Sequence, residues 1–249
     1  MHPLATYLRE LRDIRSSGAN VPETSFYGPL ANLLNDVGRA LKPRVRCIVN
    51  PKNQGAGIPG GGFFTADQLP RTCEPDLHAQ LPARGVMEVK STSDDAQRTA
   101  HSAQVARYLE TYGQVLVTNY RDFALLGRDT SGKRVELETY CLTDSETAFW
   151  AATADPYALA EAQGERCTEF LKRVMLYAAP LTNPADVAWF LASYARDAKA
   201  RIEGIDLPAL TAVRTALEEA LGVTFEGHKG DHFFRSTLVQ TLFYGIFSA

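Results

Sequence analysis

The chain has 249 residues, of which 45% are hydrophobic and 22% are charged, and this is the composition of an ordinary globular protein. Its formal net charge of −3 gives no overall basic field that would indicate nucleic acid as a partner, although a basic patch on an acidic protein still allows one. No apolar run approaches the roughly 20 residues that span a bilayer, so we expect no membrane partner.

The cysteines argue against a structural zinc site. They stand at positions 47, 73, 141 and 167, and no CxxC motif occurs. The first residues, "MHPLATYLRELRDIRSS", mix acidic and basic side chains in a helical pattern that is unlike a signal peptide. Free thiols are typical of a reducing compartment, and we therefore expect a cytoplasmic protein.

The first part of the chain predicts two helices, a strand and a loop. Apolar residues recur at helical spacing over residues 4–14 and again over residues 26–41. A strand is predicted over residues 44–50. The stretch 51–75 is rich in glycine and proline and has no sustained period, so it is predicted to be a long loop.

The middle of the chain alternates strands and helices. Short strands are predicted at 76–80 and 86–90, joined as a hairpin by the turn "LPARG". A helix over 98–113 follows, then a buried strand over 114–120. Residues 122–142 predict a second hairpin.

This order predicts an α/β fold over residues 1–142, with a mixed sheet flanked by helices. Residues 143–249 predict an all-α segment that links or couples this domain to something else. The final stretch, "HFFRSTLVQTLFYGIFSA", stops inside an apolar helical pattern without a polar cap. We therefore expect the chain to continue into a longer protein.

One predicted strand, "VMEVK", carries two charges on one face. Because side chains alternate along a strand, Met87 and Val89 point to one side, while Glu88 and Lys90 point to the other. If residues 76–80 form a hairpin with this strand, Asp76 converges with Glu88 at one end.

Two carboxylates held close repel each other unless they share a divalent cation. Oxygen ligands suit magnesium, which also takes phosphate oxygens from a substrate. A lysine beside such an ion contacts the attacking water or the charge that develops on the phosphorus. The pattern therefore indicates metal-dependent hydrolysis of a phosphodiester.

These residues resemble the signature of the PD-(D/E)xK nuclease superfamily, with Pro75-Asp76 followed by Glu88-Val89-Lys90. The resemblance implies a restriction-endonuclease-like sheet. It also implies Mg²⁺ held by Asp76, Glu88 and the Val89 carbonyl, and Lys90 as the residue that orients water or stabilises the transition state.

Two further features match the superfamily. Glu23 stands at the start of the second predicted helix, where related proteins commonly carry an additional acid that acts near the metal through a water. Gln104 and Tyr108 share one helical face at i, i+4. This pair resembles the QxxxY helix of the RecB-like branch, in which the two side chains support the lysine and the DNA.

The resemblance narrows to the N-terminal nuclease part of large single-chain restriction-modification enzymes, in which a nuclease precedes an N6-adenine methyltransferase. It implies duplex DNA as a partner, together with methyltransferase and target-recognition parts of a larger polypeptide. It also implies a role in restriction-modification or phage defence. No "NPPY" motif occurs in this sequence, so we do not expect the chain to methylate DNA by itself.

One departure concerns the first acid. In that group the aspartate can lie in a glycine-rich "PDGG"-like loop, whereas the corresponding stretch here is Pro59-Gly60-Gly61-Gly62. Either Asp76 is the ligand, or the site lacks one of its usual acids.

Simpler interpretations stand beside these. Glu88 and Lys90 also fit a surface ion pair on an exposed sheet face, Glu23 fits an acid at a helix N-terminus, and Gln104 and Tyr108 fit a half-buried helix face. The alternatives are therefore a magnesium-dependent DNA endonuclease, a catalytically impaired nuclease-like module that binds DNA or a partner domain, and a structural assembly domain.

A separate basic group surrounds the first predicted strand. Lys42, Arg44 and Arg46 alternate with other residues there. They fit contacts to phosphates, but a solvated sheet edge is the commoner explanation for such a pattern.

Overall fold

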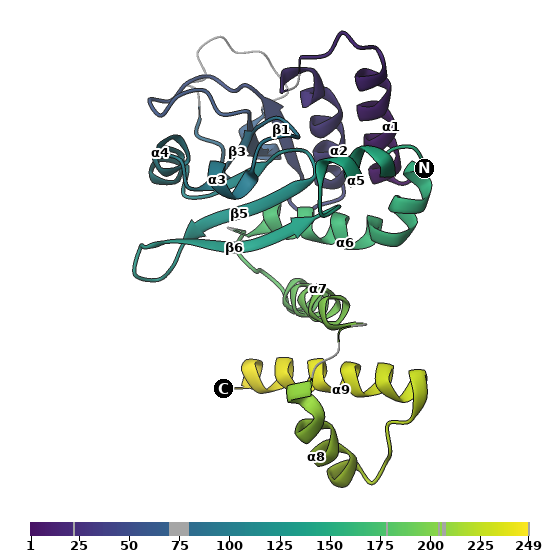
Figure 1. Cartoon of the computed structure of the whole chain (residues 1–249). Coiled ribbons are helices and arrows are strands. Elements are labelled where there is room, and N and C mark those ends of the chain that lie inside the picture. Colours follow the sequence, from purple (N-terminus) through teal and green to yellow (C-terminus); the bar gives the residue numbers. More distant parts are fainter. Residues whose placement is uncertain (22, 70–79, 178, 204, 206–207, 249) are drawn as a thin grey trace. The chain divides into compact units, whose positions relative to one another are not determined.

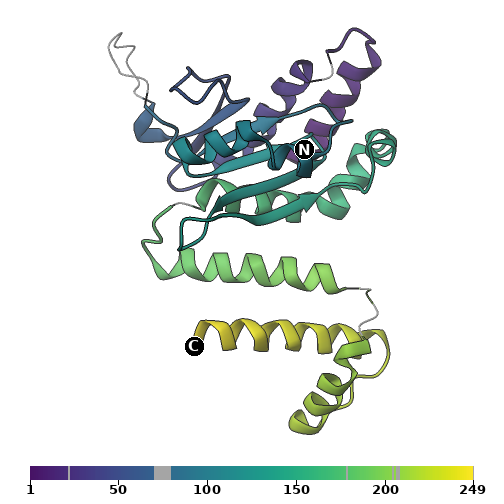
Figure 2. The same cartoon turned by 60° about the vertical axis from the view of Figure 1, so that its left-hand side comes forward.

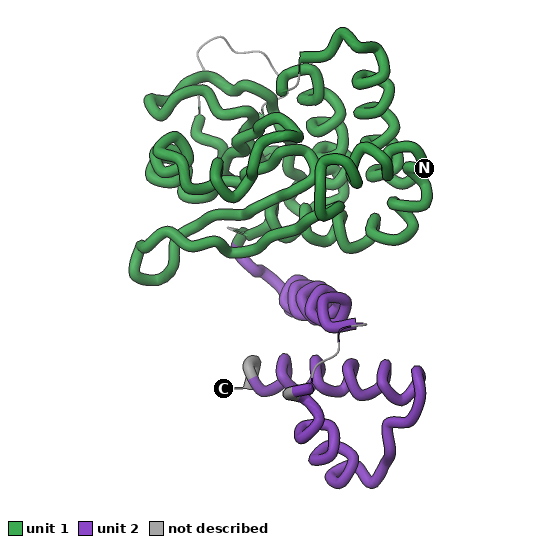
Figure 3. The backbone as a smooth tube through the Cα atoms, in the orientation of Figure 1, with its two compact units in different colours: residues 1–179 green, residues 180–249 purple. Residues whose placement is uncertain are grey.

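A computed structural model describes residues 1–21, 23–69, 80–177, 179–203, 205 and 208–248. The chain forms two compact units, Met1–Ala179 and Pro180–Ala249 (Figure 3). The first unit extends past the boundary predicted at residue 142, since the two helices that follow that residue belong to it.

The first unit alternates helices and strands in the order of Figure 1. Its elements are α1 (Pro3–Ser16), η1 (Thr24–Phe26), α2 (Tyr27–Arg39), β1 (Val45–Val49), β2 (Gly61–Thr65), η2 (Ala66–Gln68), β3 (Val86–Val89), α3 (Ala96–Ala100), α4 (Ala103–Tyr112), β4 (Val115–Thr118), β5 (Asp122–Arg128), β6 (Arg134–Cys141), α5 (Glu146–Ala152) and α6 (Pro156–Leu176).

The strands form one mixed sheet whose spatial order follows the sequence from β1 to β6. β3 and β4 pair in parallel, with Glu88 opposite Val117, and the other neighbours pair antiparallel. The parallel pair needs a crossover connection, which α3 and α4 provide. The structure confirms the predicted α/β fold with a mixed sheet flanked by helices.

Helices cover both faces of the sheet (Figures 1 and 2). One apolar cluster joins α1, α2 and α6 to strand residues that include Met87 and Val89. A second cluster joins α3 and α4 to the opposite face, which includes Val86 and Val117. The predicted alternation of β3 is therefore confirmed, and Glu88 lies on the face of the second cluster.

The prediction of an unbroken loop over residues 51–75 is wrong at β2. Strand β2 pairs antiparallel with both β1 and β3, and Gly61 lies opposite Met87. A Cβ built on Gly61 would overlap the end of the Met87 side chain, so the glycine permits a close approach of the two strands. Two glycines that resemble a loop signal in the sequence thus begin a strand.

The predicted partner of β3 also differs. We expected residues 76–80 to form a hairpin with it, but the antiparallel neighbour of β3 is β2. The strand predicted over 76–80 lies largely outside the described residues.

The helix predicted over 98–113 is two helices. Ser102 interrupts it, because its Oγ accepts a hydrogen bond from the backbone N–H of Val105 at 3.2 Å and so caps the start of α4. Gly113 ends α4 in the left-handed conformation, as predicted. The break sets the direction of α4, which carries Gln104 and Tyr108.

The second unit is helical, with α7 (Pro184–Ile202), η3 (Pro208–Leu210), α8 (Thr211–Leu221) and α9 (Gly227–Ser248). Within it, α7 and α9 lie alongside each other (Figure 2). Lys199 Nζ lies 2.8 Å from His232 Nε2, and Arg235 bonds the Ile202 carbonyl. None of the helices in the described ranges is long and apolar enough to cross a membrane.

Candidate acid–lysine site

Strand β3 brings Glu88 and Lys90 together at its C-terminal end. The backbone N–H of Lys90 donates to the Thr118 carbonyl at 2.9 Å, which continues the parallel pairing past the last strand residue. The Lys90 ammonium lies 2.8 Å from a carboxylate oxygen of Glu88, whose side chain is only 5% exposed. A solvated ion pair on an open sheet face is therefore excluded, because the carboxylate is buried.

Burial and charge act against each other at this pair. Burial raises the pKa of Glu88, and the hydrogen bond and positive charge of Lys90 offset only part of that rise. Burial lowers the pKa of Lys90, but Glu88, Glu23 and Asp94 outweigh it, so the pKa of Lys90 is raised. The site thus holds a carboxylate that is costly to keep charged beside a lysine that stays charged.

Glu23 is the second acid at this position. It precedes η1, and its carboxylate lies 3.8 Å from the Lys90 ammonium. The Tyr27 hydroxyl donates to a carboxylate oxygen of Glu23 at 3.1 Å. Burial, together with the negative charge of Glu23, raises the pKa of Tyr27, so Tyr27 remains a donor at neutral pH. Glu23 therefore serves as more than an acid at a helix start, since its side chain contacts the predicted site.

A second tyrosine holds the backbone of Glu23. The Tyr120 hydroxyl donates to the main-chain carbonyl of Glu23. Tyr120 is fully buried and has a φ of 74°, the left-handed region that only a few per cent of non-glycine residues adopt. The Tyr7 hydroxyl donates to the Tyr120 carbonyl at 2.7 Å. Packing and hydrogen bonds from α1 and η1 thus fix a strained residue that positions Glu23.

Helix α4 contributes the predicted pair. The Gln104 amide donates to the Tyr108 hydroxyl at 2.9 Å, and the Tyr108 side chain is buried. Tyr108 belongs to the same apolar cluster as Val86, on the face of β3 that carries Glu88. Burial raises the pKa of Tyr108, and the hydrogen bond from Gln104 offsets part of that rise. A Cβ on Gly57 would lie 3.5 Å from that hydroxyl, so the glycine-rich loop lies next to Tyr108. The structure therefore brings Glu23, Glu88, Lys90, Gln104 and Tyr108 into one region.

The glycine-rich stretch lies directly against β3. Gly60 is buried, and its carbonyl accepts the backbone N–H of Asn50 at 3.2 Å. A Cβ on Gly60 would lie 2.9 Å from Val89 Cγ2, closer than real Cβ contacts come. Any side chain at position 60 would therefore displace Val89. The stretch in which the sequence resemblance allowed for an aspartate therefore has its backbone too close to β3 for a side chain.

The sequence comparisons give no family. No protein-family model matches the chain, and no curated protein matches it. One solved structure, described as "cryoEM structure DrdV-DNA complex", aligns with 98% of this chain at 17% identity and a TM-score of 0.39. This chain spans 21% of the length of that one.

In the described part of the chain, the oxygen atoms that could bind a metal ion at this site are those of the Glu88 and Glu23 carboxylates and the main-chain carbonyl of Val89. Hard oxygen donors suit Mg²⁺, which usually takes one or two protein carboxylates and completes its shell with water and phosphate oxygens. The part of the chain that the structure describes contains no group of three or more His, Cys, Asp or Glu residues placed to hold a metal. Asp76, the remaining predicted ligand, lies outside that part.

Three site residues were missed at the sequence level. Tyr27 follows Glu23 by four residues, a spacing that predicts contact on one helical face and was available as a signal. Tyr7 and Tyr120 are 113 residues apart in the sequence and meet only in the folded chain, so no local pattern indicates them.

Proposed function

We propose that the first unit is a magnesium-dependent DNA endonuclease domain that hydrolyses phosphodiester bonds within a restriction-modification or phage-defence system. The observation that carries the proposal is the buried Glu88 carboxylate in contact with Lys90, with the Glu23 carboxylate 3.8 Å from the same ammonium. A buried, partly compensated charge is costly for folding, and such groups cluster where chemistry is done.

Each residue has a role in this proposal. Glu88 and Asp76, with the Val89 carbonyl, would hold Mg²⁺, and the bound ion would stabilise negative charge on the phosphate oxygens. Lys90 donates hydrogen bonds to the attacking water or to a phosphate oxygen that gains charge in the transition state. Glu23 acts on the same water, and Gln104 and Tyr108 keep the lysine end of the site in place.

The test is cleavage of plasmid DNA with magnesium. Glu88→Gln and Lys90→Ala should each lower the rate by about 10²-fold or more, the size of effect expected when an acid–base or charge-stabilising group is removed. Lys133→Ala is the matched control, because Lys133 lies in the exposed β5–β6 turn. Chelation by EDTA should abolish cleavage. Equal nicking by the wild type and both site variants would contradict the proposal.

A specific observation favours a second function, a nuclease-like module that binds DNA or a partner domain without cutting. Gly60 leaves no acid, and no space for one, against the end of β3. If Asp76 does not complete the site, Glu88 and Lys90 remain as an ion pair without metal. Magnesium titration by calorimetry separates the two functions: heat of binding that Glu88→Gln removes supports the nuclease, and DNA binding without magnesium uptake or cleavage supports the module.

A further inference from the structure

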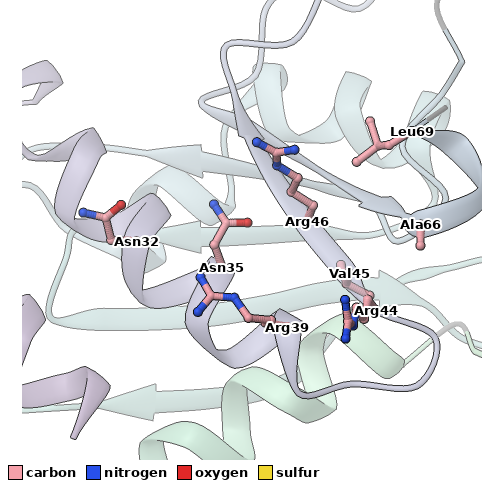
Figure 4. A pocket seen from close by; sticks show the side chains of 8 residues that line it. All are labelled: Asn32, Asn35, Arg39, Arg44, Val45, Arg46, Ala66 and Leu69. Atoms are coloured by element: carbon pink, nitrogen blue, oxygen red, sulfur yellow. The ribbon is translucent and has the colours of Figure 1, made fainter. Parts of the chain in front are cut away.

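A second charged feature lies away from the acid–lysine site. A cavity of about 580 Å³ opens between α2 and the start of β1 (Figure 4). Its lining includes three arginines and two asparagines, Arg39, Arg44, Arg46, Asn32 and Asn35, and none of its described lining residues is acidic. In a chain with a net charge of −3, this is a local concentration of positive charge.

Two of the guanidinium groups are available to a ligand. Arg44 and Arg46 are exposed, and neither forms an ion pair with any residue in the described ranges. Arg39 lies 3.2 Å from Asp36, but the Arg39 side chain is 72% exposed, so solvent weakens that pair. An anion that enters the cavity therefore meets donors that are already hydrated and need not break a buried contact.

The backbone under these arginines is fixed. The Asn35 amide donates to the Cys47 carbonyl at 3.2 Å, and its oxygen accepts the Cys47 backbone N–H at 2.9 Å. These two hydrogen bonds from one side chain join α2 to the edge strand of the sheet and occupy the outward-facing N–H and carbonyl of Cys47. Arg44 and Arg46 are thus held at a fixed separation on a rigid edge, and pairing with a further strand is blocked at Cys47.

The arginines of the cavity and the acid–lysine site lie toward opposite ends of α2. Glu23 precedes the helix through η1, and Arg39 is its last residue. Thirteen helical residues span about 20 Å. A DNA duplex carries one phosphate per about 1.7 Å of its axis, counting both strands, so a second phosphate contact at this offset is always available.

We propose that Arg39, Arg44 and Arg46 bind backbone phosphates of duplex DNA at a distance from the cleavage site, an inference that rests on DNA as the proposed substrate. Exposed guanidiniums bind phosphate by charge and counterion release, without reading the sequence. A small free phosphate fits less well, because a site selective for it needs buried donors, and the charged groups of this cavity are exposed.

The experiment measures binding of a labelled duplex to the full chain by fluorescence anisotropy, across a series of salt concentrations, with EDTA present to prevent cleavage. Arg44→Ala/Arg46→Ala should reduce the slope of log K against log salt by about 0.9 for each phosphate that is no longer neutralised, which is roughly 1.8 for two arginines. Arg44→Lys/Arg46→Lys should retain most of the slope, because both charges remain. Arg128→Ala, at the end of β5, removes an exposed arginine elsewhere and should leave the slope unchanged.

The outcomes separate this inference from the proposed nuclease. A slope for the double alanine variant equal to that of Arg128→Ala overturns the inference, even if the wild type cleaves DNA. If the double alanine variant has a reduced slope and the wild type never cleaves DNA, the result supports the inference and contradicts the nuclease. Preferential binding of duplex RNA, or displacement of DNA by inorganic phosphate at constant ionic strength, would overturn the assignment to the DNA backbone.

Discussion

The Lys90–Glu88 pair makes a prediction that does not depend on catalysis. We consider Lys90→Met, which keeps the length of the side chain and removes its charge. In the wild type the two groups lie 2.8 Å apart, with the side chains of Glu88 and Lys90 5% and 32% exposed. At an effective dielectric constant of about 20, this separation corresponds to a gross attraction of about 6 kcal/mol.

The net loss of stability is smaller than that attraction. Breaking a fully buried ion pair costs about 3–5 kcal/mol, but Lys90 is one-third exposed, and Glu88 can take up a proton instead of remaining charged. We therefore expect Lys90→Met to lower the free energy of unfolding by about 2 kcal/mol at neutral pH. For a unit of 179 residues, this corresponds to a decrease in Tm of about 4–8 °C.

The stability lost in Lys90→Met should increase as the pH rises. The pKa of Glu88 is already raised by burial, and Lys90 supplies the interactions that lower it. Without them the pKa rises further, so the folded variant binds a proton more tightly than the unfolded chain does. The contribution of Glu88 to the stability of the variant is then fully present below the unfolded pKa of about 4.3 and is lost as the pH rises through the folded pKa of Glu88. The raised pKa of Lys90 adds no dependence in this range, because its contribution is lost only well above neutral pH.

The assay is thermal unfolding followed by circular dichroism from about pH 5 to about pH 8. The difference in Tm between the wild type and Lys90→Met should grow with pH, and Glu88→Gln/Lys90→Met should remove that growth, as a double-mutant cycle requires for a direct interaction. Lys133→Met controls for the loss of one exposed lysine. A Tm difference that stays constant across the range would refute the reasoning, because it would show that Glu88 does not titrate in response to Lys90.

Two further substitutions test the backbone around the site. Tyr120→Phe leaves the part-buried carbonyl of Glu23, at the start of η1, without its donor and should cost about 0.5–1.5 kcal/mol in urea unfolding. Tyr112→Phe should cost little, because the Tyr112 hydroxyl has no hydrogen bond in the described part of the chain. Equal losses for the two variants would contradict the positioning role of Tyr120. Gly60→Ala places a Cβ against Val89 and should lower the free energy of unfolding by about 1–3 kcal/mol. Gly28→Ala, with open space around it in α2, should be neutral or stabilising. If Gly60→Ala is as stable as the wild type, β3 can shift to make room for the added methyl group.

The charged strand of the site could be predicted because its signal is local. Alternation along "VMEVK" fixes which side chains share a face, and the pairing of Glu88 with Lys90 follows from a spacing of two residues. The i, i+4 pair of Gln104 and Tyr108 is equally local and forms the expected hydrogen bond. For these residues, the chemistry of one element is enough to place the atoms.

The rest of the site depends on contacts that no short window contains. Gly61 lies in a strand that pairs with β1 and β3, and Met87, opposite it, fills the space that a side chain at position 61 would need. Tyr120 adopts its left-handed conformation because Tyr7 and the carbonyl of Glu23 hold both ends of it. In each case the favourable interaction comes from a residue at least 26 positions away, and local propensity alone predicts a loop or an ordinary turn.

The separation of the two charged sites allows binding and chemistry to be measured independently. Glu88 and Lys90 lie at the end of β3, whereas Arg44 and Arg46 lie at the start of β1, and both strands run in the same direction because each pairs antiparallel with β2. Substitutions at one end therefore leave the contacts of the other intact. In a nuclease that uses both ends, Lys90→Ala loses cleavage but keeps the part of the salt slope that Arg44 and Arg46 supply. A DNA-binding module requires only the arginines, and in that case the same substitution changes neither property.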